Sequence, residues 1–132
     1  MNSLFASAKQ AFLDGLIAWR TDAIVCVLVD TAVYGYSPNH ASLADIPVGG
    51  RVKTSGTLAN RTSTGGVADA DDLAFGTVTG RVSAAVVYKA GVSDLASPLI
   101  TYIDQGQTFP ATAAGEGITL FWDNGTSKIF AL

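Results

Sequence analysis

The stretch AIVCVLV at residues 23–29 is the longest apolar run in the chain, and most of its members are β-branched. A run of this kind predicts a strand that is buried on both faces, and Asp30 and Thr31 end it. Cys26, the single cysteine, lies inside this run. We therefore expect it to behave as a small buried apolar residue and not as a reactive thiol.

The last residues of the chain predict a second β element. Residues 117–123 (GITLFWD) and 126–132 (TSKIFAL) flank Asn124-Gly125. Asn-Gly favours a type I′ turn, because both central residues of that turn need a positive φ, so a terminal hairpin is predicted. Both faces of its first strand are largely apolar, which predicts a strand covered from both sides.

One helix is predicted near the N-terminus. Residues 3–14 carry apolar side chains at helical spacing, namely Leu4, Phe5, Ala8, Phe12 and Leu13. Asn2 or Ser3 can cap its start, and Gly15 can end it.

Short segments separated by turn residues fill the rest of the chain. Residues 32–50 are rich in Gly and Pro and predict a long loop with one short helical turn at 42–45. Strands are expected within 52–58, 61–68, 73–78, 84–89 and 99–104. The sequence thus predicts one mainly β domain over residues 1–132, an antiparallel β-sandwich or partly open barrel with one N-terminal amphipathic helix.

Composition favours a protein that binds other proteins. Of the 132 residues, 48% are hydrophobic and only 14% are charged, so we expect neutral or apolar surface that a partner covers. The net charge of −3 and the scattered basic residues argue against nucleic-acid binding. The N-terminus lacks the pattern of a signal peptide, and no apolar run is long enough to span a membrane, so we expect synthesis in a cytoplasm and no membrane partner.

Few residues suggest chemistry. His40 is the only histidine and has no accompanying nucleophile motif, so no catalytic residue and no cofactor are predicted. Asp69, Asp71 and Asp72 form the one carboxylate cluster and are candidate calcium ligands. They lack the spacing of an EF-hand, and the alternative is a solvated turn whose side chains bind nearby backbone N–H groups.

Tyr34, Tyr36 and His40 are the candidate interaction residues, because they place aromatic side chains on the long loop. The alternative is that they cover the edge of the core. Together with Trp19, the two tyrosines also suggest a carbohydrate-binding module.

The chain resembles a family of small structural proteins of tailed bacteriophages. The segments that carry the resemblance cover nearly the whole sequence: residues 11–15 (AFLDG), 28–32 (LVDTA), 43–47 (LADIP), 51–56 (RVKTSG), 66–72 (GVADADD), 85–89 (AVVYK), 99–104 (LITYID), 117–125 (GITLFWDNG) and 128–130 (KIF). No functional residue carries over from this family.

The resemblance implies a virion structural protein without enzymatic activity. Its leading form is a capsid decoration or cement protein on the exterior of the phage head, and the alternative is a tail-tip, collar or fibre-attachment component. Either form implies phage capsid or tail proteins as partners and a homo-oligomer in the particle. We expect residues 34–50 and the N-terminal helix to make the contacts.

Overall fold

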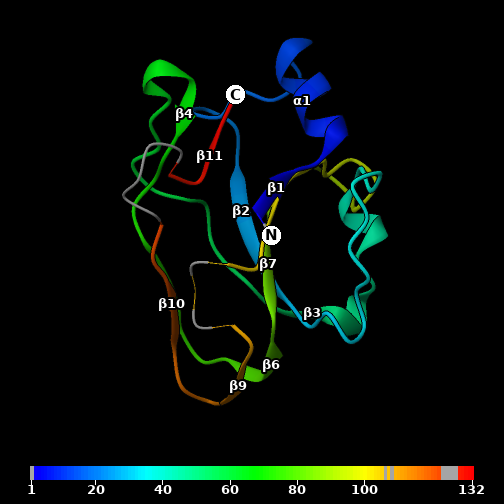
Figure 1. The fold of residues 1–132 in the computed structure, drawn as a ribbon, viewed down its shortest axis with the longest axis vertical. Helices are drawn as coiled ribbons and strands as arrows, with labels where there is room; N and C mark the ends of the chain where they lie inside the picture. Colours follow the sequence, from blue (N-terminus) through cyan, green and yellow to red (C-terminus); the bar gives the residue numbers. More distant parts are fainter. Residues whose placement is uncertain (1, 106, 108, 123–127) are drawn as a thin grey trace.

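The computed structural model describes residues 2–105, 107, 109–122 and 128–132 (Figure 1). The helical elements in this part of the chain are the α-helix α1 (Ala6–Leu13) and the 3-10 helices η1 (Leu43–Asp45), η2 (Val48–Gly50) and η3 (Thr64–Gly66). The strands are β1 (Asn2–Leu4), β2 (Ile24–Val29), β3 (Arg51–Thr54), β4 (Val67–Ala68), β5 (Leu73–Phe75), β6 (Thr79–Val82), β7 (Ala84–Lys89), β8 (Leu99–Ile103), β9 (Ala111–Ala114), β10 (Ile118–Leu120) and β11 (Phe130–Ala131).

An antiparallel sheet with the strand order β1-β8-β7-β2-β3 forms the centre of the described residues. β2 and β7 are paired without interruption, from Ile24 opposite Lys89 to Val29 opposite Ala84. The pairs β10-β5, β11-β4 and β6-β9 form small separate sheets. The mainly β fold with an N-terminal helix is therefore confirmed, and these sheets do not close into a barrel.

Strand β2 is buried on both faces, as its sequence predicts. Side chains of a strand alternate between the two faces of a sheet, so the six residues divide equally. Ile24, Cys26 and Leu28 pack into one apolar cluster, which we call the first core. Val25, Val27 and Val29 pack into a second cluster on the other face, the second core.

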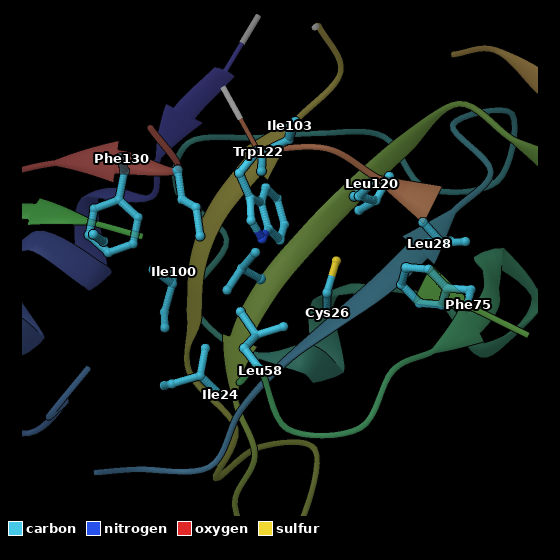
Figure 2. Packing of buried hydrophobic residues seen from close by; sticks show 14 of the residues in the cluster. Ile24, Cys26, Leu28, Leu58, Phe75, Ile100, Ile103, Leu120, Trp122 and Phe130 are labelled. Atoms are coloured by element: carbon cyan, nitrogen blue, oxygen red, sulfur yellow. The ribbon is translucent and has the colours of Figure 1, made fainter. Parts of the chain in front are cut away.

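The small sheets cover the first core. Phe75 from β5, Leu120 from β10 and Phe130 from β11 all pack there with Trp122. Figure 2 shows Trp122, Leu120 and Phe75 around Cys26 and Leu28 of β2. Val82 from β6 and Ala113 from β9 also belong to the first core, so each small sheet contributes apolar side chains that a pair of strands of two to four residues alone leaves in water.

The long loop covers the second core. Tyr34, Leu43 and Ile46 lie in this cluster with Phe5, which precedes α1, and Ala8 of that helix. In Figure 1 the 3-10 helices of this loop lie on the opposite side of β2 from β10. The predicted helical turn at 42–45 is confirmed as η1.

The predicted terminal hairpin is wrong in its strand pairing. β10 pairs with β5, with Leu120 opposite Leu73, and β11 pairs with β4, with Phe130 opposite Ala68. The predicted turn residues Asn124 and Gly125 lie outside the described residues. β10 and β11 pair with distant strands and not with each other, because this arrangement places Leu120 and Phe130 in the first core.

The other face of the predicted terminal strand is also not covered as expected. Ile118, Leu120 and Trp122 do face the first core, but Phe121 between them is 62% exposed. The expectation of cover on both sides is therefore wrong for Phe121.

The N-terminal helix begins later than its sequence predicts. Residues 2–4 form β1 at the edge of the central sheet, and the backbone N–H of Phe5 donates to the carbonyl of Ile100 at 3.0 Å. Phe5 is the N-cap residue, without a side-chain cap. The predicted end is correct, since Gly15 follows α1 with a φ of +72°, a conformation that glycine adopts without a steric penalty.

Candidate interaction surface

Large apolar side chains are exposed at the C-terminal end of α1. Leu13 is 87% exposed and Leu16 is 64% exposed, while Ala8 and Ala11 on the inner side of the helix are buried. Leu132, beside β11, is 66% exposed. The apolar spacing of the sequence placed Leu13 on the inner face with Phe12, but in the structure Leu13 points away from the core. Its position four residues after Lys9, on the same helical face, is the signal that could have revealed this.

Two hollows flank Leu132 at this end of the molecule. The first, of about 340 Å³, lies between the residues after α1 and the β4-β11 pair, and its lining includes Phe12, Trp19 and Phe130. The second, of about 390 Å³, is lined by Leu4, Lys9, Leu13, Ala131 and Leu132. We call the two hollows with Leu13 and Leu132 the α1 surface.

The aromatic wall of the first hollow is fixed in place. Trp19 and Phe130 meet edge to face with ring centroids 5.1 Å apart, and Phe12 lies 5.6 Å from Phe130. The indole N–H of Trp19 donates to the carbonyl of Thr62 at 2.9 Å, which sets the orientation of the ring. A ligand entering this hollow therefore meets a preorganised apolar wall.

The candidate interaction residues of the long loop are partly buried. Tyr34 is 1% exposed, and its hydroxyl lies 2.9 Å from Nδ1 of His40. Burial raises the pKa of Tyr34 well above its ordinary value, so the hydroxyl stays protonated. Tyr36 is half-buried against Tyr102, with ring centroids 4.4 Å apart. The loop thus uses these aromatic rings to cover the second core, and Tyr36 and His40 keep partial exposure.

The residues suggested for sugar binding do not come together. Tyr34 belongs to the second core, whereas Trp19 belongs to the first, on the opposite face of the central sheet. Both side chains are buried. They therefore form no common stacking platform with Tyr36.

The three aspartates proposed as calcium ligands bind separate protein partners. A carboxylate oxygen of Asp69 lies 3.2 Å from Nζ of Lys128, and one of Asp71 accepts from Nδ2 of Asn60 at 2.5 Å. Asp72 accepts from the backbone N–H of Trp122 at 2.9 Å. Within the described ranges, no three His, Cys, Asp or Glu side chains gather in an arrangement that could hold a metal ion. Asp72 and Asp69 thus tie the residues next to β10 and β11 to the segment between β4 and β5, and Asp71 ties that segment to the loop after β3.

The long loop is fixed by charged groups at both ends of η1. The carboxylate of Asp45 accepts from the backbone N–H groups of Ala41 at 2.8 Å and Ser42 at 3.2 Å, which lowers its pKa, the Ala41 bond contributing most. The guanidinium of Arg51 donates to the carbonyls of Leu43 and Ile46 and lies 3.1 Å from Asp94. Val48 remains exposed on this anchored loop. The loop is thus a second, smaller place where apolar side chains face outward.

Cys26 is fully buried in the first core, as its sequence context predicts. Desolvation raises the pKa of its thiol far above the ordinary value. The thiolate, which is the reactive form, is therefore suppressed in the folded protein.

A scan against protein-family models finds no family that matches this chain, and a search of curated proteins finds no match either. Among the helices that the structure describes, none combines the length and the apolar character needed to cross a membrane.

Proposed function

We propose that this protein is a non-enzymatic structural component of a bacteriophage virion, bound as a decoration or cement protein to the exterior of the head. The resemblance of segments over nearly the whole chain to small structural proteins of tailed phages supports the virion assignment. The geometry that supports a binding role is the α1 surface, where Leu13 and Leu132 stand exposed beside two hollows.

Exposed apolar residues that gather at one place mark interaction sites more often than scattered ones do. Leu13 and Leu132 both line the second hollow, and Leu132 also lines the first. Burying such side chains against a capsid subunit is favourable by the hydrophobic effect, at about 25 cal/mol per Å². A protein that binds only the assembled lattice stabilises that lattice by mass action.

The same surface serves a tail location equally well, so a tail-tip, collar or fibre-attachment role is the second candidate. Copy number separates the two. A decoration protein is present in numbers comparable to the major capsid protein, whereas a tail or neck component is present in small multiples of the tail symmetry. The carbohydrate-binding alternative has less support, because Trp19 and Tyr34 are buried in different cores.

Quantitative mass spectrometry of purified phage particles tests the proposal. We expect a ratio to the major capsid protein near one, or near a simple fraction of it. A ratio of a few per cent would instead assign the protein to the tail or neck. Absence from purified particles would remove the virion assignment altogether.

A further inference from the structure

We propose that the first hollow of the α1 surface binds an apolar side chain of the partner protein that has a carboxylate next to it. This inference rests on the proposed function in one respect, since it takes the occupant to be a segment of the protein bound in the particle. It adds the chemistry of the contact: an aromatic or large aliphatic group for the hollow and an acidic group for Arg20 at its edge.

The cations at the α1 surface differ from most others on the molecule. Four basic side chains are paired with acidic residues of the chain, as Arg51–Asp94, Arg81–Asp30, Lys89–Asp22 and Lys128–Asp69. Arg61 donates to the backbone carbonyl of Asp22. The Asp22 carboxylate, beside the first hollow, is thus already engaged by Lys89 and by the backbone N–H of Ala18. Within the described part of the chain, Lys9, Arg20 and Lys53 have no such partner.

Two of these three unpaired cations line the two hollows. Arg20 lines the first hollow and Lys9 lines the second, while Lys53 lies on β3. The chain as a whole is acidic, with a net charge of −3, whereas the side chains of Arg20 and Lys9 bring unpaired positive charge to these hollows. Charge complementarity therefore favours an acidic partner segment over a basic one.

The walls of the first hollow favour an apolar anchor. Phe12, Trp19 and Phe130 supply aromatic surface, and a volume of about 340 Å³ exceeds that of one large side chain. Thr21 and Ser63 supply further polar groups to the lining. Binding pockets combine a mostly apolar lining with few polar groups in this way, and the polar groups fix the orientation of the ligand. A carboxylate beside the anchor can reach the Arg20 guanidinium, which binds carboxylates through paired N–H donors.

A pair of small probes tests this chemistry on the isolated protein. 3-Phenylpropionate carries an aromatic ring and a carboxylate, and 3-phenylpropylammonium carries the same ring with the opposite charge. We expect the anion to bind with an affinity on the order of millimolar and to shift the amide NMR signals of Thr21, Ser63 and Gly66, which line the hollow. The cation should bind at least several-fold more weakly.

Matched variants separate the role of Arg20 from general charge. R20Q should weaken binding of 3-phenylpropionate about fivefold, the size of one exposed ion pair. K53Q removes the unpaired cation on β3 and should leave the affinity unchanged. Equal binding of anion and cation, or an equal effect of the two variants, would overturn the acidic assignment. Shifts confined to another part of the molecule would overturn the assignment of the hollow.

Sedimentation of the free protein distinguishes the other occupant, a second copy of this chain. Concentration-dependent dimerisation that shifts the same amide signals would give the hollow to a second copy and contradict the proposal. The tests of the hollow and of the proposed function can fail independently. Absence of the protein from phage particles removes the virion role and leaves the NMR result standing, whereas a negative NMR result leaves the copy number untouched.

Discussion

Replacing Arg51 with methionine should destabilise the fold far more than replacing any exposed arginine. The guanidinium donates from Nε and Nη2 to the carbonyl of Ile46, at 3.0 and 2.7 Å, and from Nη2 to the carbonyl of Leu43 at 2.8 Å. Nη1 lies 3.1 Å from Asp94 on the segment between β7 and β8. One side chain thus joins η1, the residue after it and the neighbouring loop. Methionine keeps most of the apolar stem and removes all of these bonds.

The stability lost in R51M depends on which hydrogen-bond acceptors the substitution leaves unpaired. Ile46 is fully buried, so its carbonyl loses its charged donor in a place that water does not reach, whereas the Leu43 carbonyl keeps the backbone N–H of Ile46. Losing hydrogen bonds to a charged group and leaving one buried acceptor unpaired costs about 2–3 kcal/mol. The pair with Asp94, which is half exposed, adds less than about 1 kcal/mol. A total of about 3 kcal/mol lowers the Tm of a domain of this size by about 10 °C.

Thermal and urea unfolding followed by far-UV circular dichroism measures this loss. R81M is the matched control, because Arg81 bonds Asp30 at 2.9 Å but is nearly half exposed. We expect R81M to lower the Tm by a small fraction of the R51M effect. Equal losses in the two variants would refute the claim that Arg51 fixes the long loop over the second core.

Three further predictions concern the cores and the loop. L28A should lower the free energy of unfolding, measured in urea, by about 2–5 kcal/mol, because Leu28 is fully buried. L13A, at an exposed position, should change it by less than about 0.5 kcal/mol. Similar losses in the two variants would contradict the two-core packing. Cys26 should resist alkylation at pH 8 until urea unfolds the protein, and fast labelling of the native state would show an open first core. Asp45 accepts backbone N–H bonds, which lowers its pKa in the folded protein below the ordinary value of 3.8. It therefore stabilises the fold above that pH, and this stabilisation is lost as the pH falls through the folded pKa. D45N should make the Tm fall less steeply with pH below about pH 4, and an unchanged dependence would contradict this.

The sequence predicts the local structure best where one signal dominates. The run at 23–29 is apolar throughout, and β2 is buried on both faces. Gly15 ends α1 as expected, because few other residues adopt its positive φ easily.

Long-range pairing is where prediction from the sequence fails. The predicted helix includes residues 3 and 4, but in the structure residues 2–4 pair with the edge of β8 as β1. The strands β6 and β9 contain Gly80 and three alanines, residues that are depleted in strands, so their sequences give only a weak strand signal, and they pair with each other in the structure. β10 and β11 lie on either side of Asn124-Gly125 in the sequence, but they pair with β5 and β4. The turn signal is local, so it does not reveal which distant strand each of them joins.

For the candidate site, too, the sequence shows the local features but not the long-range packing. The aromatic residues on the long loop could be found from the sequence, but their burial could not, because Tyr34 packs against Tyr102 from a distant strand. From the sequence we expect contacts from the N-terminal helix but do not identify Leu13 as an exposed residue, because helical spacing alone does not say which apolar side chains the sheet covers. Leu13 lies on the same face of α1 as Lys9, away from the buried Ala8 and Ala11, and is exposed there.

Rebinding of purified protein to phage heads stripped of it tests the central claim most directly. Wild type and V92S, which alters an exposed apolar residue on the segment between β7 and β8, should both bind the heads and raise their melting temperature. L13S, which alters the α1 surface, should lose most of this binding while it remains folded. Binding of wild type to tails alone, or equal binding of L13S and V92S to heads, would contradict the account.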